Sequence, residues 1–394
     1  KRKVENFISH QSNKKFTALF SQCRVAFYFI LKFLKKKSNR NEIIFCAYNL
    51  PEMVNIASNL KFKIKFCDLN YKTGTIDIDD LKKNISKKTL AVVLTNMFND
   101  FKSSNIVKKL VKKKNIFLIE DNAIYFDNYT KINGKTLYSG SLGDFSIFSF
   151  NIMKNISSLY GGAAATDNSE FIQFYKKEEK KLKKFFYFPL LKQATIFLIL
   201  KIMSVNFLFK YFFVKIISFS HKNKINFILK LFYPSLRSIK MNFPRYYFTK
   251  ISNFSINATF LQLKNKEKRL KLFNLRKKKH KYYYKFISKL KTKYIFLIKT
   301  SDKNYQNFLD FPLLVKNKDK LNKYLLDRGI EVRLKHYYNC ARMFNYKKKC
   351  LNAERYEREL ICFPVHKKIS ISYIENLSKN MNKFFQIESN AQKN

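Results

Sequence analysis

The chain has 394 residues, and its 79 lysines and arginines outnumber its 27 aspartates and glutamates, giving a formal net charge of +52. Its hydrophobic content of 46% is ample for packed domains and excludes an intrinsically disordered chain. With only 7 glycines and 6 prolines, collagen-like and linker-rich chains are excluded as well.

The positive charge has two explanations that the sequence leaves open. Lysine, asparagine, isoleucine and phenylalanine are abundant while glycine, alanine and proline are rare, as expected for a gene rich in A and T. Most lysines would then form a solvated surface. A basic surface also attracts anionic lipids or nucleic acid through its long-range field, so the charge suggests partners without naming them.

The cysteines and histidines give no sign of a metal site. The five histidines are dispersed, and the six cysteines form no CxxC pair and no zinc-like spacing: Cys23, Cys46, Cys67, Cys340, Cys350 and Cys362. The opening segment up to Lys15 is polar and basic, without the apolar run of a signal peptide. These features predict a reducing, cytoplasmic location.

Residues 1–180 are predicted to form an α/β domain. Short apolar runs predict strands at Ile43–Ala47, Lys63–Cys67, Leu90–Thr95, Ile116–Glu120 and Phe145–Phe150. Amphipathic stretches between them predict helices at Arg24–Lys36, Glu52–Leu60, Asp79–Ile85 and Asn105–Lys114. Because the strands are apolar throughout, we expect a doubly wound, mostly parallel sheet covered on both faces, with ligands at the carboxyl ends of its strands.

Residues 181–245 interrupt this pattern with a hydrophobic, lysine-punctuated insertion. Charges recur so often that no window of about 18 residues is free of them, which disfavours a membrane-spanning helix: Lys192, Lys201, Lys210 and Lys215. Two interpretations remain open. The segment forms helices in a membrane interface, with lysines reaching toward anionic headgroups, or a helical insertion buried against the domain or a dimer partner.

Residues 246–394 are predicted to form a smaller α+β domain with a connecting helix at Asn257–Phe286. The remaining pattern predicts a helix at Lys318–Asp327 and strands at Tyr294–Thr300, Phe311–Val315, Ile330–Leu334 and Leu360–Phe363. The basic run Arg276–Lys281 could bind phosphates, but on a helix such a run is more often a solvated face. No specific nucleic-acid partner is expected.

The informative motifs follow two strands of the first domain. Asp121 comes directly after one buried strand, and Lys154 follows the end of another. Four of the seven glycines lie in the same region, at positions 140, 143, 161 and 162. In a chain that otherwise avoids glycine, these positions are expected to need a positive φ angle or close approach of two backbones.

These motifs resemble the DegT/DnrJ/EryC1/StrS family of sugar aminotransferases, pyridoxal-phosphate enzymes of fold type I. The family's IEDAAQ, GSLGD, FSFxxxKN and GGA stretches correspond in order to Ile119–Ile124, Gly140–Asp144, Phe148–Asn155 and Gly161–Ala163. Cys23–Phe27 falls at the family's turn into the first helix, and two late stretches also agree: Arg328–Arg333 and Ala353–His366. The resemblance spans Ser21 to Lys368 except for the apolar insertion.

The resemblance implies roles for particular residues. Lys154 would hold pyridoxal 5'-phosphate as a Schiff base and then move the substrate proton, while Asp121 would pair with the pyridine nitrogen. The cofactor phosphate would sit at the start of the first helix, on the backbone N–H groups of Arg24 and Val25, with the hydroxyl of Ser149.

Further roles are assigned by the same resemblance. Tyr48 is the nearest candidate for the aromatic residue that stacks on the cofactor, although the family's aromatic can also align with Leu50. Arg333 and His336 are candidates for holding anionic substrate groups. Ile124 stands where the family has glutamine, and Cys23 replaces glycine at the phosphate turn, which puts cofactor affinity and substrate choice in doubt.

The implied function is transfer of an amino group, from glutamate, to a nucleotide-linked keto sugar in the biosynthesis of amino sugars and surface polysaccharide. The family also implies a homodimer, and residues 185–217 could dock the protein on the inner membrane face. The alternative is a catalytically altered family member that acts as a basic membrane-surface or nucleic-acid-binding protein. The presence of both Lys154 and Asp121 argues against that alternative.

Overall fold

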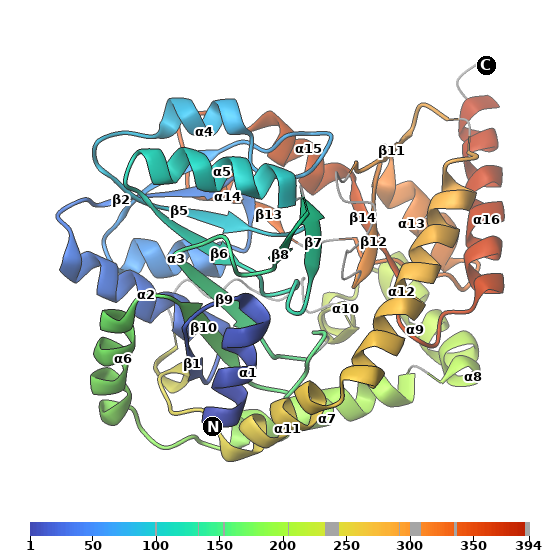
Figure 1. Cartoon of the computed structure of the whole chain (residues 1–394). Helices are drawn as coiled ribbons and strands as arrows, with labels where there is room; N and C mark the ends of the chain where they lie inside the picture. Colours follow the sequence, from blue (N-terminus) through green and yellow to red (C-terminus); the bar gives the residue numbers. More distant parts are fainter. Residues whose placement is uncertain are drawn as a thin grey trace.

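The computed structural model describes residues 1–98, 101–132, 134–152, 154–203, 205–232, 244–290, 292–299, 309–334 and 337–390 (Figure 1). Within them, seven strands form the central sheet in the order β1-β10-β9-β6-β5-β2-β4. Their bounds are Phe16–Phe20 (β1), Glu42–Cys46 (β2), Lys63–Cys67 (β4), Thr89–Thr95 (β5), Phe117–Asp121 (β6), Phe145–Ser149 (β9) and Gly162–Thr166 (β10). The pairings from β4 to β9 are parallel, which confirms the predicted α/β class with a mostly parallel sheet.

The antiparallel edge of this sheet was not predicted. β10 runs antiparallel to β9, and β1 runs antiparallel to β10. Both strands are short, and β10 is Gly162-Ala-Ala-Ala-Thr, which lacks the large β-branched side chains that mark a strand in sequence. Their pairing brings the chain that enters the first long helix next to the end of β9.

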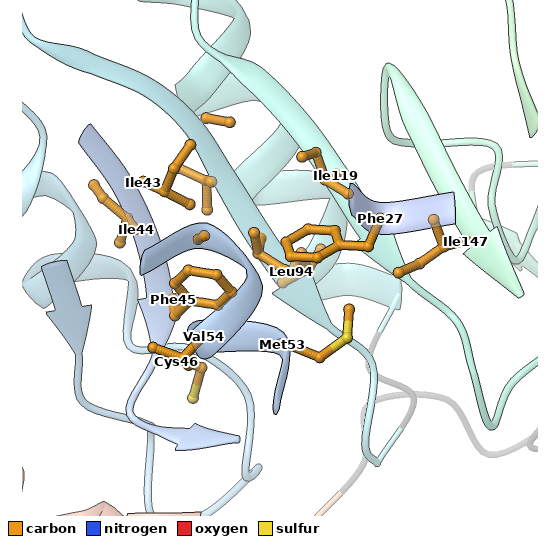
Figure 2. Packing of buried hydrophobic residues seen from close by; sticks show 14 of the residues in the cluster. Phe27, Ile43, Ile44, Phe45, Cys46, Met53, Val54, Leu94, Ile119 and Ile147 are labelled. Carbon is orange, nitrogen blue, oxygen red and sulfur yellow. The ribbon is translucent and has the colours of Figure 1, made fainter. Parts of the chain in front are cut away.

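Helices cover both faces of the sheet. α4 (Ile78–Asn84) and α5 (Phe101–Lys113) lie on one face, and α2 (Cys23–Lys37) and α3 (Pro51–Asn59) on the other (Figure 1). Figure 2 shows the packing on the α2 side, where Phe27 of α2 and Met53 and Val54 of α3 meet sheet residues such as Phe45 and Ile119. α6 (Ser169–Lys181) packs beside α2, and α1 (Arg2–Ser12) packs against β1.

The smaller domain has its own core around an antiparallel sheet, β11-β12-β14. Its strands span Ile295–Leu297 (β11), Asp310–Val315 (β12) and Leu360–Pro364 (β14), and its helices span Lys318–Leu326 (α13) and Ile371–Asn390 (α16). The expected helix at Asn257–Phe286 is two helices, α11 (Asn253–Lys264) and α12 (Lys266–Ile287). Asn265 divides them because its side chain accepts the N–H of Lys268 at 2.9 Å and starts a new helix.

Two further expectations for this half need correction or extension. The expected strand Ile330–Leu334 is no strand; Arg333 alone forms an isolated bridge, with Cys362. Small elements that the sequence gave no sign of complete the fold: β3 (Tyr48–Asn49), β7 (Tyr129–Ile132), β8 (Lys135–Tyr138), β13 (Tyr338–Asn339), α14 (Cys340–Met343) and α15 (Leu351–Glu359). β13 pairs with β3 and so ties the two domains together.

The insertion is helical throughout its described part. It contains α7 (Phe188–Met203), α8 (Asn206–Leu208), a π-helical turn (Phe209–Phe213), α9 (Val214–Lys222) and α10 (Asn226–Phe232). α9 contacts α13 of the smaller domain, so the insertion reaches from the end of α6 to that domain. Of the helices in the described ranges, none combines the length and apolar character needed to cross a bilayer.

Candidate active site

Asp121 is the last residue of β6 and so lies at the carboxyl end of that strand. It is 7% exposed, and one carboxylate oxygen accepts the N–H of Ala123 at 3.0 Å. Burial raises the pKa of Asp121, while the Ala123 hydrogen bond and the nearby Lys154 ammonium oppose that rise. A cation placed beside Asp121 would therefore stabilise its charged form.

Lys154 lies on the segment after β9 and lines the cavity. The pKa of its ammonium is lowered to about 8, chiefly by burial and in part by Arg333 and Arg24, although Asp121 and Cys23 act to raise it. Asp121, Arg24, Arg333 and Cys23 are therefore the charged or titratable neighbours that act on this amine. With a pKa near 8, about a tenth of Lys154 is neutral at pH 7, compared with about one part in 2,500 for an ordinary lysine.

The start of α2 is pressed against β10. A Cβ atom on Gly162 would lie 2.2 Å from the backbone nitrogen of Cys23, so this position accepts only glycine. Cys23 itself is buried, and burial raises the pKa of its thiol well above the usual value. The close approach between the two backbones therefore requires a glycine at position 162 of β10. It does not require one at position 23, where the helix begins with a cysteine.

The candidate phosphate residues gather at this helix start. Phe20, Gly162 and Ser149 occupy one row across β1, β10 and β9, so Ser149 lies one strand away from the chain that enters α2. The N–H of Val25 already donates to the Gln22 carbonyl at 3.1 Å, which corrects the expectation that it is free. Of the two predicted backbone donors, Arg24 alone has no carbonyl acceptor among the described residues.

The Arg24 side chain lines the cavity and faces Glu52, at 3.7 Å between a guanidinium nitrogen and a carboxylate oxygen. At that distance the pair is a loose one, and both side chains are partly exposed. An anion in the cavity could therefore compete for the guanidinium at little cost.

The loop 140–144 is held by Glu120, the neighbour of Asp121 on β6. One oxygen of Glu120 accepts the N–H of Leu142 at 2.8 Å, the N–H of Gly143 at 2.7 Å and the hydroxyl of Ser146 at 3.3 Å. Glu120 is fully buried, so these donors replace the water that its carboxylate would otherwise need. They fix the end of β6 and, with it, the position of Asp121.

Arg333 reaches the site from the smaller domain. Its guanidinium donates to a carboxylate oxygen of Asp310 at 2.7 Å, and the charge of Asp310 raises the pKa of Arg333. Its backbone exchanges two hydrogen bonds with Cys362, at 3.1 and 2.9 Å. Arg333 lines the same cavity as Lys154. The other substrate candidate, His336, lies outside the described residues.

Tyr48 does not reach the cavity, contrary to its assignment as the stacking aromatic. It is 1% exposed, its hydroxyl accepts the N–H of Tyr337, and its ring packs 5.8 Å from that of Tyr356. The physical reason is the pairing of β3 with β13, which turns Tyr48 into the core between the domains. Leu50, two residues on, lines the cavity instead, and Ile124 lines it as well.

The cavity has a volume of about 2110 Å³ and is built by both domains and the insertion. Three buried polar atoms of its lining residues have no hydrogen-bond partner in the described residues, the side-chain oxygens of Asn151, Ser157 and Gln193. Buried polar groups normally have a partner, so these oxygens favour a ligand that supplies one. The insertion forms one wall, with apolar residues and four lysines: Lys192, Lys201, Lys215 and Lys222.

The sequence pattern of the DegT/DnrJ/EryC1/StrS aminotransferase family matches residues 2–181. That range includes the strand ends, Asp121, Lys154 and the glycine motifs described above. Residues 2–181, less than half of the chain, are therefore similar to this aminotransferase family. Its members are pyridoxal-phosphate-dependent, which agrees with the lysine and the buried carboxylate at the centre of the site.

Curated relatives of this family domain are enzymes of nucleotide-linked sugars. GDP-perosamine synthase of Escherichia coli O157:H7 is 29% identical over 171 residues, which cover 42% of this chain and 44% of that protein. A UDP-4-amino-4,6-dideoxy-N-acetyl-beta-L-altrosamine transaminase of Campylobacter jejuni is 32% identical over 118 residues, 29% of this chain and 30% of that protein. The matched segment thus spans less than half the length of these relatives.

The fold extends the likeness over nearly the whole chain. DesI, solved with its TDP-sugar product, superimposes with a TM-score of 0.70 at 13% identity over 99% of this chain and 87% of that chain. Helicobacter pylori PseC, an aminotransferase of pseudoaminic acid biosynthesis, gives 0.68 at 18% identity over 98% and 91%. At such identities the likeness establishes the shared fold.

Several site residues of the family domain and its neighbour were missed by sequence reasoning. Glu120 carried a usable signal, because an acid inside an otherwise apolar strand must find buried donors. Asp310, Asn151 and Ser157 carried none, since ordinary polar residues in loops and at strand ends are common.

Proposed function

We propose that the chain is a pyridoxal-phosphate-dependent aminotransferase that moves an amino group from glutamate to a keto sugar attached to a nucleotide. The observation that carries the proposal is Lys154, an amine of lowered pKa set beside the buried carboxylate of Asp121 at the end of the sheet. A surface lysine would have neither the lowered pKa nor the facing acid. The named activities of the family's relatives support the same reaction class.

The residues present fit the cofactor. Its aldehyde needs a lysine that is partly neutral, its ring nitrogen needs a carboxylate, and its phosphate needs cations and N–H groups. Lys154 and Asp121 meet the first two needs, and the start of α2 with Arg24 and Ser149 meets the third. The unpartnered oxygens of Asn151 and Ser157 add acceptors on the same lining.

When bound, pyridoxal phosphate supplies the aldehyde that carries the amino group and a ring that takes up the electrons of a C–H bond. Lys154 would take a proton from the substrate carbon and return it, which its pKa near 8 allows close to neutral pH. Asp121 would hold a protonated ring nitrogen. Arg333, oriented by Asp310, would bind an anionic group of the substrate.

A direct test uses the near-visible absorbance of the bound cofactor. Purified protein mixed with pyridoxal phosphate should develop this band, and Lys154→Ala should abolish it. The exposed Lys88→Ala is the matched control and should keep the band in full. A wild-type protein without the band, or an unchanged band in Lys154→Ala, would overturn the assignment.

The substrate is tested by product analysis. The enzyme is incubated with pyridoxal phosphate, glutamate and a panel of nucleotide-linked keto sugars, and amino-sugar products are sought. Product formation supports the proposed acceptor class. Cofactor binding without product from any member of the panel would contradict that class while leaving the cofactor assignment standing.

The proposal extends to a homodimer in the cytoplasm, bound peripherally to the inner face of a membrane. The homodimer follows from the family and is tested by sedimentation or light scattering. The alternative, a non-catalytic basic protein, rests on the lysine excess and on the departures from the family pattern at Cys23 and Ile124. Cys23 fits at the helix start beside Gly162, so no observation at that position favours a lost activity.

A further inference from the structure

Among the described residues, the insertion carries most of the exposed large apolar side chains. Of the 25 large apolar side chains that are exposed in the described residues, 15 lie between Phe186 and Phe227. Eleven of them lie outside the cavity lining and are named here the outer face: Tyr187, Leu191, Leu198, Ile199, Ile202, Val205, Phe207, Tyr211, Phe212, Ile216 and Phe227. An apolar patch of this extent on a folded chain marks an interaction surface.

The two sides of α7 have different surroundings. Residues at helical spacing line the cavity, among them Ile196, Leu200 and Met203. The opposite side of the same helix carries Leu198 and Ile202, which are 56% and 54% exposed. A helix that is apolar all round is normally buried all round, so the outer side of α7 lacks a cover that its composition calls for.

The charge of residues 181–232 distinguishes between the possible binding partners of the outer face. Residues 181–232 contain ten lysines and no aspartate or glutamate. Placing this face against the same face of a second copy would set lysines against lysines, as the symmetry of an isologous dimer requires. An anionic bilayer complements both properties, since apolar side chains enter the acyl boundary and lysines reach the headgroups.

The geometry favours lying on the bilayer. α7 has 16 residues and is therefore about 24 Å long, short of the roughly 30 Å of a hydrocarbon core. Lysines interrupt the apolar run of α7 at Lys192 and Lys201, both exposed and both also on the cavity lining. α7 and α8 also lie together at one edge of the molecule (Figure 1).

We propose that the outer face docks the protein on the surface of an anionic bilayer, with the Lys154 cavity opening beside the lipid headgroups. The position of the cavity beside the bilayer follows from the docking, because the inner sides of the same helices form the cavity wall. The docking proposal rests on the proposed function only in treating that cavity as the active site. Docking does not require catalysis, so vesicle binding and cofactor absorbance are scored separately.

The absence of tryptophan from the sequence gives a clean experiment. Phe227→Trp places a single fluorophore at the most exposed outer-face position, at 84%, and Leu351→Trp places one on α15, outside the insertion, at 62%. Mixed with vesicles of phosphatidylglycerol and phosphatidylcholine, Phe227→Trp should shift to the blue and be quenched by brominated acyl chains. Leu351→Trp should do neither.

Binding is then measured by co-sedimentation with the same vesicles. Leu198→Glu/Ile202→Glu, on the outer face, should weaken vesicle binding at least tenfold, and the matched double variant Leu351→Glu/Ile387→Glu should not. Binding should fall steeply with added salt and be weak on pure phosphatidylcholine. A normal cofactor band in each variant shows that loss of binding is not loss of folding.

Three results would overturn the proposal. The first is wild-type protein that stays in the supernatant with anionic vesicles at low salt. The second is equal loss of binding in the two double variants. The third is a dimer that Leu198→Glu/Ile202→Glu converts to a monomer in the absence of lipid, which would make the outer face a protein interface. A missing cofactor band alone would refute the proposed function and leave docking intact.

Discussion

The ionisation of Lys154 gives the sharpest test of the site, because its neighbours push its pKa in opposite directions. Burial brings the pKa to about 8, with Asp121 raising it and Arg333 and Arg24 lowering it. Asp121→Asn removes a charge that favours the ammonium, so the pKa should fall below 8. Arg333→Gln removes a charge that disfavours it, so the pKa should rise. Each shift is expected to be about one pH unit.

The measurement is competitive acetylation at trace reagent between about pH 6 and pH 11, followed by peptide mass spectrometry. The rate at each lysine follows its neutral fraction, so Lys154 should titrate with a midpoint near 8. Near neutral pH its neutral fraction exceeds that of an ordinary lysine by a factor of about 200. Lys88, exposed on the surface, serves as the internal reference in every sample.

Stability provides an independent readout with a defined sign. The folded pKa of Lys154 lies below the unfolded value of about 10.4, so between about pH 8 and pH 10 the unfolded chain binds more protons and Lys154 costs progressively less stability as pH rises. The difference in unfolding free energy between Lys154→Met and wild type should therefore shrink across that window. A midpoint equal to that of Lys88, or a rise in pKa with Asp121→Asn, would refute the assignment of Lys154.

Three further predictions concern the scaffold of the site. Gly162→Ala should lower the urea midpoint and the cofactor band strongly, because its Cβ would lie 2.2 Å from the Cys23 nitrogen; Gly329→Ala, with open space around it but a φ of +75°, should cost only about 1 kcal/mol. Glu120→Gln should destabilise the fold by roughly 2–4 kcal/mol, seen in urea unfolding, because the amide cannot accept all three donors as the carboxylate does. The six cysteines, all buried and with the Cys46 thiol raised to a pKa of about 12, should not react with a disulfide reagent at pH 8 until the protein unfolds, when six thiols appear.

The parallel part of the sheet could be predicted because its signals are local. β2, β5 and β6 are continuous apolar runs bounded by polar turns, and their predicted bounds agree with the structure to within a residue or two. β10 could not be predicted in this way. Its alanines are favourable in a helix, and they form a strand only because β9 and β1 on either side leave room for small side chains.

The site residues show the same contrast between local motifs, which could be predicted, and distant contacts, which could not. Asp121 and Lys154 stand in motifs of fixed order, so resemblance could place them side by side. Tyr48 was misplaced because its orientation depends on β13, a two-residue strand almost 300 positions away that no local pattern indicates. The partnership of Arg333 with Asp310 was equally hidden, since it joins a loop to a strand start across the smaller domain.

The insertion shows why composition alone left two interpretations open. An apolar, lysine-rich segment is compatible with burial and with a lipid surface, because both remove apolar side chains from water. In the structure the inner sides of these helices line the cavity, and the outer sides, such as Leu198 and Ile202, are exposed, which leaves lipid contact of the outer sides as the proposal to be tested. The lysines of residues 181–232 have no acid within that segment to balance them, whereas pairs such as Lys82–Asp79 are exposed and of small energetic effect.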